Sequence, residues 1–428
     1  MIREDAKILG APVEYETFLQ NIDKKDIYLF SVNLEGIGLS KRLRALGLNV
    51  KGFVDSRYST PRKSLPVFDP DIFFSNCNPS KQVLIVCTKD REWKKNVIER
   101  ARSHLFIRYQ NLYTPLDICR FFPTIEIAGK CNLRCRTCDM GLPGANKGRG
   151  HMNSDIFESV LDKMTREIPL MNSVALYTWG EPLLNPEIPQ IIKICNKYGV
   201  ATEISSNLEY QKNLEEFLLA GPDQIIAPCS GVGERYERGR TGGTWANYLK
   251  ALKVIASIKE KHNLDYNVRI MYHLYKDNLY DDLDYMRKLA AEYNFTLIPI
   301  VAHLFPGRVY DFAINGIEIP EIMKEASKDL IFSIDDQLNF VKSKINTKCH
   351  IINAFPTVSW DCKVLHCCNM QWPTVGDFNF LETPLKTFIE KRNSSTWCTN
   401  CMNKGIHRFF DVNIKLEDKN GKRHIQRI

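Results

Sequence analysis

The chain has 428 residues, of which 44% are hydrophobic and 25% charged, and its formal net charge at pH 7 is +8. Two or three domains are expected, because a single hydrophobic core stops growing at about 250–300 residues. No stretch reaches the roughly 18 consecutive apolar residues of a membrane span, and the first ten residues lack the basic-then-apolar order of a signal peptide. Composition therefore predicts a cytosolic, or cytoplasmic, protein that does not enter a membrane.

The positive charge favours an anionic ligand such as a phosphate or a nucleotide-linked sugar. Lys and Arg are spread along the chain without a basic arm, so nucleic acid is not an expected partner. The 14 cysteines are many for a compartment in which disulfides rarely persist. Their clusters at 131–138 and 349–401 indicate metal ligands or redox chemistry.

Residues 1–115 alternate strand-like runs at 27–32, 49–55 and 82–88 with helix-like stretches, which predicts a small parallel α/β domain. The turn after the first run contains two glycines, Gly36 and Gly38. Asp55 ends the second run about 20 residues further on, as in Rossmann-like dinucleotide folds. Because the usual turn has three glycines, two interpretations stay open: a nucleotide site, or a degenerate module used for docking or for positioning the substrate.

The alternation restarts at about residue 120 and continues to 310. The strand-like runs lie at 124–129, 173–179, 201–207, 224–230, 267–274 and 296–304. The amphipathic stretches between them include 154–168, 187–198, 211–220, 244–262 and 279–293. A repeated βα unit that closes into a partial, TIM-like barrel is the economical architecture, with the functional site at the C-terminal ends of its strands.

The last part of the chain has a different character. Residues 311–344 form a predicted connecting segment, and residues 345–428 are rich in Cys, Trp, Asn and short turns with little periodicity. This composition suits a small lobe that is ordered partly by metal.

The strongest chemical signal comes directly after the first barrel strand, where Cys131, Cys135 and Cys138 lie within eight residues. Three thiolates can hold one face of a four-iron cluster and leave the fourth iron open to another ligand. Structural clusters and zinc sites usually close with four protein ligands, so an open iron implies reactivity. A zinc loop that takes its fourth ligand from elsewhere is the alternative.

This cysteine spacing resembles the C-x3-C-x2-C motif of the radical S-adenosylmethionine (radical SAM) superfamily. One βα unit later, Trp179, Gly180, Glu181 and Pro182 look like the Gly-Glu-Pro motif of that family, although alone they would be an ordinary turn. The family's strand edge at this motif binds the cofactor's methionine ammonium, which needs carbonyl or carboxylate acceptors. The resemblance implies a partial (β/α)6 barrel, a [4Fe-4S] cluster on the three cysteines and S-adenosylmethionine as cofactor, cleaved to a 5′-deoxyadenosyl radical that abstracts a substrate hydrogen.

Two further segments extend the resemblance. Ser206 and Asn207 are similar to the family's Ser-Asn-Gly turn, which contacts the cofactor, but Leu208 replaces the glycine. An ordinary turn or helix cap is the alternative. Arg240 resembles the arginine that pairs with the methionine carboxylate in the branch with extra clusters, and a guanidinium matches that forked group. A solvated surface arginine is the alternative.

The C-terminal cysteines resemble the SPASM or Twitch extension of this superfamily, which runs Cys, a gap, Gly, four residues, Cys, and later Cys-x2-Cys. The resemblance implies one auxiliary [4Fe-4S] cluster held by Cys349, Cys367, Cys398 and Cys401. Cys362 takes the place of the glycine, and Cys368 is a second candidate for the position of Cys367. A zinc ribbon is the alternative.

Other cysteines and two histidines also fall at informative positions. Cys229 ends a barrel strand and could donate hydrogen to a product radical, as epimerising members of the family need. His273 and His303, near strand ends, are candidate proton acceptors. The remaining cysteines lie in apolar segments and are expected to be core thiols: Cys77, Cys87, Cys119 and Cys195.

These features predict a radical SAM oxidoreductase, isomerase or lyase, with an electron donor such as flavodoxin or ferredoxin. The predicted substrate is a sugar, aminosugar or nucleotide-linked sugar that is oxidised, epimerised or deoxygenated. Modification of a ribosomal peptide or protein side chain is the alternative, although residues 1–115 do not resemble a winged-helix domain for a leader peptide. A non-catalytic zinc or iron scaffold whose N-terminal module binds nucleotide is a third hypothesis.

Overall fold

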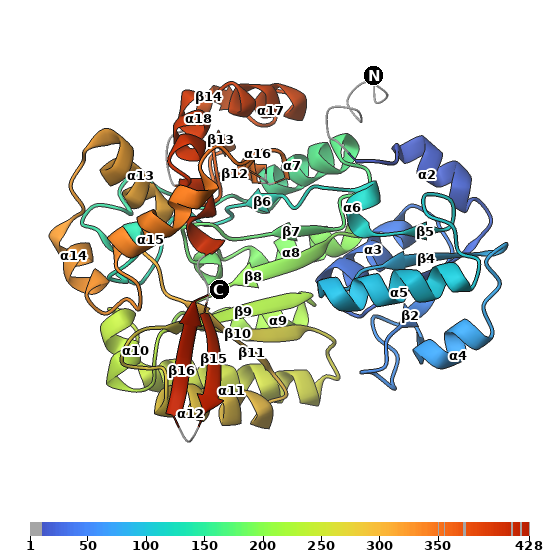
Figure 1. The fold of residues 1–428 in the computed structure, drawn as a ribbon, viewed down its shortest axis with the longest axis horizontal. Helices are drawn as coiled ribbons and strands as arrows, with labels where there is room; N and C mark the ends of the chain where they lie inside the picture. Colours follow the sequence, from blue (N-terminus) through green and yellow to red (C-terminus); the bar gives the residue numbers. More distant parts are fainter. Residues whose placement is uncertain are drawn as a thin grey trace.

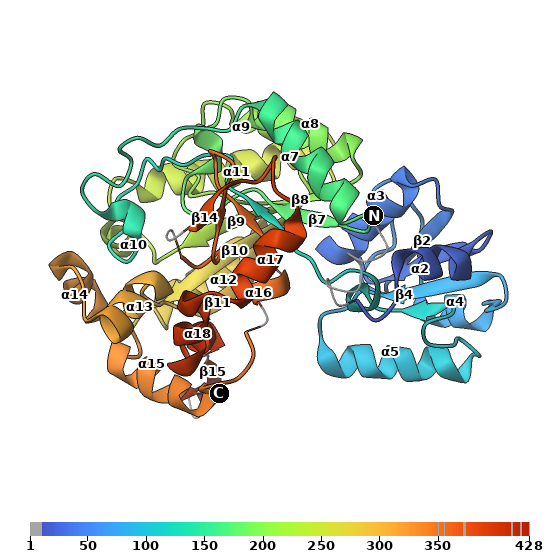
Figure 2. The ribbon, with the colours of Figure 1, turned by 90° about the horizontal axis from the view of Figure 1, so that it is seen from above.

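The computed structural model describes residues 11–349, 351–354, 356–370, 374–411, 414–419 and 422–427. The first ten residues, which the signal-peptide argument used, lie outside this part of the chain. The fold is α/β, with an N-terminal unit beside a larger unit built on a second sheet (Figures 1 and 2). None of the described helices combines the length and the apolar character that crossing a membrane requires.

In the described residues, the N-terminal unit has a five-stranded parallel sheet with the order β3-β2-β1-β4-β5. The strands are β1 (Asp26–Phe30), β2 (Val50–Val54), β3 (Val67–Phe68), β4 (Gln82–Val86) and β5 (Leu112–Tyr113). The helices are α2 (Tyr15–Ile22), α3 (Leu34–Ala45), α4 (Pro70–Ser75), α5 (Arg91–Ser103) and α6 (Pro115–Ile118). The parallel Rossmann-like order is therefore confirmed, and the two shortest strands are the ones that the sequence did not predict.

Both glycines of the candidate nucleotide turn are used in close packing. A Cβ atom at Gly36 would overlap the carbonyl oxygen of Ser31, and one at Gly38 would overlap the carbonyl oxygen of Asn172 in the larger unit. Asp55, the acidic residue that ends the second predicted strand, pairs with Arg57 at 2.6 Å. These contacts favour the docking interpretation of the N-terminal module.

Buried ion pairs join the module to the larger unit. The side chain of Asp223 is fully buried, and its carboxylate contacts Lys41 at 2.6 Å and Lys63 at 2.9 Å. Burial raises the pKa of Asp223, but the two ammonium groups outweigh it and lower the pKa overall. Arg42 donates hydrogen bonds to three backbone carbonyls of the larger unit, those of Thr165, Pro169 and Tyr198. The module is thus fixed near the N-terminal ends of strands in the larger sheet.

The larger sheet has nine strands among the described residues, with the order β11-β10-β9-β8-β7-β6-β12-β13-β14. Its parallel barrel strands are β6 (Thr124–Ile125), β7 (Ser173–Ala175), β8 (Ala201–Ser205), β9 (Gln224–Cys229), β10 (Asn267–Leu274) and β11 (Thr296–Val301). The intervening helices are α7 (Ser154–Glu167), α8 (Ile188–Lys197), α9 (Leu214–Leu219), α10 (Glu234–Gly239), α11 (Trp245–Lys261) and α12 (Asp281–Glu292). The predicted partial barrel is confirmed.

The C-terminal part continues the barrel sheet, which the sequence did not predict. Its sheet strands are β12 (Thr357–Val358), β13 (Lys363–Leu365) and β14 (Thr374–Asn379), and β12 pairs in parallel with β6. The helices are α13 (Pro306–Asn315), α14 (Glu321–Ser327), α15 (Ile334–Val341), α16 (Ile351–Ala354), α17 (Leu385–Asn393) and α18 (Thr396–Asn403). A separate antiparallel hairpin comprises β15 (Ile414–Lys419) and β16 (Lys422–Arg427).

The barrel sheet separates an apolar outer layer from a more polar interior. Helices α8 and α9 lie on one side of the curved sheet, and α15 and α18 lie on the other (Figure 2). Strand β10 illustrates the difference between the two faces of the sheet. Its alternate residues are buried, whereas Arg269, Met271 and His273 between them are half-buried. The interior face therefore keeps side chains available for a site.

Candidate active site and metal sites

A cavity of about 460 Å³ lies at the C-terminal ends of the barrel strands. Its lining includes Ser205, Ser230 and His273, which lie at or just after the ends of β8, β9 and β10. The volume falls in the range of about 300–1,000 Å³ that is common for small-molecule sites. The cavity is where the βα architecture was expected to place function.

Cys131, Cys135 and Cys138 line this cavity together. Burial raises the pKa of the Cys138 thiol, and the nearby thiols of Cys135 and Cys131 raise it further. Among the described residues, no three His, Cys, Asp or Glu side chains are placed to hold one metal ion. The thiolates of a four-iron cluster bind different irons and need not converge on one point, and the cationic irons favour their deprotonated form.

The cysteine loop is held at both ends by neighbouring segments. The side chain of Asn146 accepts a hydrogen bond from the backbone of Cys131 at 3.0 Å and donates one back at 2.9 Å. Immediately after the last cysteine, Asp139 forms a buried ion pair of 2.5 Å with Arg308 on α13. These contacts orient the loop toward the cavity without using any of its three thiols.

Glu181 organises the turn after β7. Its carboxylate accepts hydrogen bonds from the Ser206 hydroxyl at 2.7 Å, the backbone N–H of Asn207 at 2.8 Å and that of Leu183 at 3.0 Å. Burial raises the pKa of Glu181 above its usual value, although these hydrogen bonds act in the opposite direction. The carboxylate therefore links the ends of β7 and β8, which is an orienting role. Next to it, a Cβ atom on Gly180 would overlap the carbonyl oxygen of Ala128, and Pro182 begins a short 3-10 helix.

The side chains of the predicted pair, Ser206 and Asn207, point in different directions. Asn207 lines the cavity, and its side-chain amide nitrogen lies 3.8 Å from the Cys131 sulfur and 2.9 Å from the Asn132 side-chain oxygen. The hydroxyl of Ser206 turns to Glu181, and this residue does not line the cavity. Ser205, which sequence reasoning did not select, lines the cavity instead.

Two buried polar groups in the cavity wall fit the presence of a bound ligand. Within the described part of the chain, the Trp179 indole N–H and the Thr178 hydroxyl have no hydrogen-bond partner. Both residues line the cavity, and the Trp179 ring lies 4.6 Å from that of Phe305, centroid to centroid. Leaving such groups unsatisfied costs about 1–3 kcal/mol, so an acceptor in the cavity would stabilise this wall.

Arg240 supplies a positive charge to the same cavity. Its guanidinium donates to the Ser230 hydroxyl at 3.2 Å and lies 3.4 Å from the Nδ1 atom of His273. Burial and the charge of Arg240 lower the pKa of His273 to about 3. His273 is therefore neutral at physiological pH, and the guanidinium is the fixed charge beside it.

His303 also lines the cavity as a neutral imidazole. Burial lowers its pKa, and its Nδ1 atom lies 2.5 Å from the Gln337 side-chain oxygen. Because an amide oxygen only accepts, this nitrogen carries the proton, and Nε2 is left as the acceptor. His303 is therefore in position to accept a hydrogen bond at Nε2, whereas the acceptor nitrogen of neutral His273, Nδ1, already faces the Arg240 guanidinium.

Cys229 does not share this position. Its thiol is fully buried and contacts the Gly231 carbonyl at 3.2 Å, while its neighbours Pro228 and Ser230 line the cavity. Alternation along β9 directs this side chain to the core, so the structure does not bring the expected hydrogen donor into the cavity. Besides the three cysteines of the loop, Cys368 lines the cavity.

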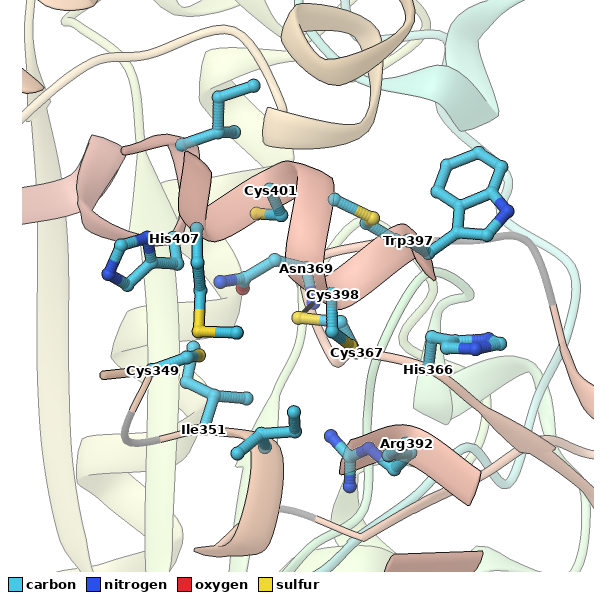
Figure 3. Close-up of a pocket in the computed structure, with 14 residues that line it drawn as sticks. Cys349, Ile351, His366, Cys367, Asn369, Arg392, Trp397, Cys398, Cys401 and His407 are labelled. Carbon is cyan, nitrogen blue, oxygen red and sulfur yellow. Dashed lines mark hydrogen bonds between the residues drawn. The ribbon is translucent and has the colours of Figure 1, made fainter. Parts of the chain in front are cut away.

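A second, smaller cavity of about 50 Å³ lies in the C-terminal part (Figure 3). Its lining contains all four predicted auxiliary ligands, Cys349, Cys367, Cys398 and Cys401. The last two lie three residues apart on α18, a spacing that places both on one face of the helix. The four thiols thus line one cavity; like the thiols of the loop they do not converge on one metal ion among the described residues, and the thiolates of a four-iron cluster bind different irons.

Neighbouring residues 367 and 368 face different cavities. Cys367 lines the small cavity, Cys368 lines the large one, and Asn369 lines both. The wall between the two sites is thus a few residues thick. Cys362 lines neither cavity.

Comparison with known proteins identifies relatives of this chain. Residues 125–290 match the radical SAM superfamily. The tungsten-containing aldehyde ferredoxin oxidoreductase cofactor-modifying protein of Pyrococcus furiosus is 24% identical over 253 residues, 57% of this chain and 69% of that protein. The solved structure of SuiB from Streptococcus suis is 13% identical, covers 76% of this chain and 78% of its own, and has a TM-score of 0.45. The structure of BtrN in complex with AdoMet and 2-DOIA is 13% identical, covers 66% of this chain and 87% of its own, and has a TM-score of 0.37.

Proposed function

We propose that this chain, whose residues 125–290 match the radical SAM superfamily, is a member of it that cleaves S-adenosylmethionine reductively and abstracts a hydrogen atom from a sugar, aminosugar or nucleotide-linked sugar. The observation that carries the proposal is one cavity of about 460 Å³ that combines the three thiols of the loop with the edges of the barrel strands. The enzyme is a small-molecule oxidoreductase in this proposal, with flavodoxin or ferredoxin as electron donor.

The residues of the cavity divide the binding tasks. Cys131, Cys135 and Cys138 hold a [4Fe-4S] cluster, which when bound supplies the electron for cleavage of the cofactor. Arg240 pairs with the carboxylate of the methionine moiety, because a guanidinium matches that group in charge and shape. Glu181 orients the strand edge around it through its three hydrogen bonds.

The other lining groups support a carbohydrate substrate. Neutral hydrogen-bonding side chains surround the cavity: Thr137, Ser230, His273, Tyr275, His303 and Asn369. Such groups match hydroxyls, which both donate and accept, and they leave no charge unpaired when a neutral sugar binds. The Trp179 and Phe305 rings add an apolar face for the carbon skeleton.

The C-terminal cysteines favour oxidation among the possible outcomes. In our proposal Cys349, Cys367, Cys398 and Cys401 hold an auxiliary [4Fe-4S] cluster behind the wall of the reaction cavity. The contact between the two sites at residues 367 and 368 gives an electron from a substrate radical a short route to that cluster. An alcohol carbon would then become a carbonyl.

The first test measures 5′-deoxyadenosine after anaerobic reconstitution with iron and sulfide, followed by dithionite and S-adenosylmethionine. We expect product from the unmodified chain and none from the variant with Ala at positions 131, 135 and 138. Cys77→Ala, at a half-buried thiol in the N-terminal unit, is the control and should keep wild-type turnover. Equal product from all three proteins would contradict the proposal.

The substrate class needs a separate measurement. We expect nucleotide-linked sugars or aminosugars to increase the rate of 5′-deoxyadenosine formation and to be converted to products about 2 mass units lighter, because oxidation removes two hydrogens. Short peptides rich in Cys, Ser or Tyr are the comparison. Stimulation and conversion of a peptide, without any effect of sugars, would replace the carbohydrate proposal with peptide modification.

A further inference from the structure

The side chain of Asn207 is fixed in one orientation just after β8. The residue is 6% exposed, and its backbone N–H donates to the Glu181 carboxylate at 2.8 Å. Its side-chain oxygen accepts a hydrogen bond from the backbone N–H of Glu209 at 2.9 Å. An amide oxygen only accepts and an amide nitrogen only donates, so this bond determines which way the amide group is turned. The nitrogen is therefore the atom that faces the cysteine loop.

The amide nitrogen carries two hydrogens, and each of them has an acceptor in the cysteine loop. One acceptor is the side-chain oxygen of Asn132 at 2.9 Å, and the other is the sulfur of Cys131 at 3.8 Å. The bond to Asn132 holds the amide beside the sulfur. When Cys131 is a thiolate, the sulfur carries a full negative charge and becomes a stronger acceptor.

A hydrogen bond to a ligating sulfur changes how readily a cluster accepts an electron. Reduction adds one negative charge to the iron and sulfur atoms, so the positive end of an N–H dipole stabilises the reduced form more than the oxidised form. Hydrogen bonds to the sulfurs are among the factors that set the reduction potential of a four-iron cluster. Because Asn207 is buried, solvent screens this interaction less than it would at the surface.

We propose that the Asn207 amide donates a hydrogen bond to the Cys131 thiolate and raises the reduction potential of the cluster that the loop holds. This inference rests on the proposed function. In the step it serves, the cluster gains one electron from the external donor, and the donor is oxidised by one electron. Asn207 is thus a positioning residue that acts through Cys131. This role is separate from the contact with S-adenosylmethionine that the sequence resemblance implies for it.

The test is an EPR-monitored redox titration of the full chain with Ala at positions 349, 367, 398 and 401, so that only the loop cluster contributes. S-adenosylmethionine is left out, because its own contact with Asn207 would affect the result. Asn207→Leu is close in size and has no N–H group in its side chain. We expect it to lower the ratio of reduced to oxidised cluster at a fixed potential at least about threefold, equivalent to a shift of about 28 mV for one electron.

The control for the titration is Asn247→Leu. Asn247 is an exposed asparagine on α11 and does not line the cavity, so this variant should keep the potential of the parent. An unchanged potential in Asn207→Leu, in a protein that retains the loop cluster, would overturn the role of Asn207.

Pulsed EPR gives a second readout without changing the auxiliary cysteines. In protein labelled with ¹⁵N at its asparagine side chains, we expect the reduced loop cluster to show a nitrogen coupling that Asn207→Leu removes. If Asn207→Leu loses its iron, Asn207→Asp takes its place, because it keeps the shape of the side chain and lacks the N–H group. The same coupling in the unmodified chain and in the variant that retains iron would contradict the hydrogen bond.

Iron analysis separates failure of this inference from failure of the proposed function. If the unmodified chain binds no more iron than the variant with Ala at positions 131, 135 and 138, the loop holds no cluster, and the proposed function fails together with this inference. If the loop cluster is present but neither its potential nor its nitrogen coupling depends on Asn207, only this inference fails.

Discussion

Two residues at positions where the sequence resemblance expects glycine have left-handed backbone conformations. Leu208 and Cys362 both have φ of 63°. Side chains with a Cβ atom pay about 1–2 kcal/mol in this region, which explains why glycine suits both positions. Leu208 is fully buried, and its packing offsets the cost. Local packing therefore offsets the backbone strain at these two positions.

We predict that Cys362→Gly changes the free energy of unfolding by less than about 1 kcal/mol, because relief of strain compensates for the lost burial of a small side chain. Leu208→Gly should destabilise by about 2 kcal/mol or more, since it removes a large core side chain. Chemical denaturation measures both. Iron content should stay unchanged in Cys362→Gly, and a loss of iron would identify Cys362 as a ligand.

The two adjacent cysteines should differ in their effect on metal. Cys367 lines the small cavity and Cys368 the large one, so we predict that Cys367→Ala loses about four irons per chain and Cys368→Ala loses none. Iron analysis of the reconstituted proteins measures the difference. The reverse result would assign the auxiliary ligand to Cys368.

His273 should make stability depend on pH. Its pKa is lowered to about 3 in the folded protein by burial and by Arg240 and His303, whereas an unfolded histidine titrates near 6.5. Below pH 6.5 the unfolded chain binds more protons, so stability is complete above that pH and falls as pH decreases, by up to about 1.4 kcal/mol per pH unit. We predict a shallower slope between pH 6.5 and 5 for His273→Gln in denaturation experiments.

The exposed His262 provides the matched control for this slope. His262→Gln should keep the wild-type dependence, because this side chain is exposed and does not line the cavity. Other effects of acid are common to all three proteins and cancel in the comparison. Identical slopes for His273→Gln and the unmodified chain would show that His273 is not held neutral by its surroundings.

At the scale of elements, local patterns were predicted well and long-range pairing was not. Strand β10 matches its predicted range of 267–274, because its alternating burial extends over eight residues. The pairing of β12 with β6 joins only Thr357 to Thr124 and Val358 to Ile125. Two-residue strands carry no periodicity, and no local signal connects segments more than 200 residues apart, so the sequence could not show that the C-terminal part extends the barrel sheet.

The candidate site follows the same division. The three cysteines of the loop could be found because their spacing is local and their place after a strand fixes the edge of the sheet. The opposite orientations of Cys367 and Cys368 depend on tertiary packing, and so does the contact between Asn207 and Cys131. Cys229 shows the limit most clearly, because a strand end leaves open which face the side chain takes.

For the whole molecule, the N-terminal unit and the barrel share one continuous hydrophobic core and a polar interface at its edge. Asp223 lies in this interface between Lys41 and Lys63, with none of its side chain exposed. The interface lies at the opposite end of the strands from the reaction cavity. The module therefore acts on the stability of the barrel, and none of its described residues lines the reaction cavity.

The buried carboxylate tests this view of the assembly. We predict that Asp223→Ala lowers the free energy of unfolding by about 3 kcal/mol, because two largely buried lysines lose their fully buried ion-pair partner. Asp26→Ala removes an exposed ion pair with Lys51, 3.7 Å long, within the N-terminal unit. It should lower the free energy of unfolding by less than about 1 kcal/mol. Denaturation followed by circular dichroism measures both, and hydrogen exchange at α3 reports whether the module loosens first. Equal, small effects of the two substitutions would mean that the apolar contacts alone hold the module, and that the ion pairs only accompany them.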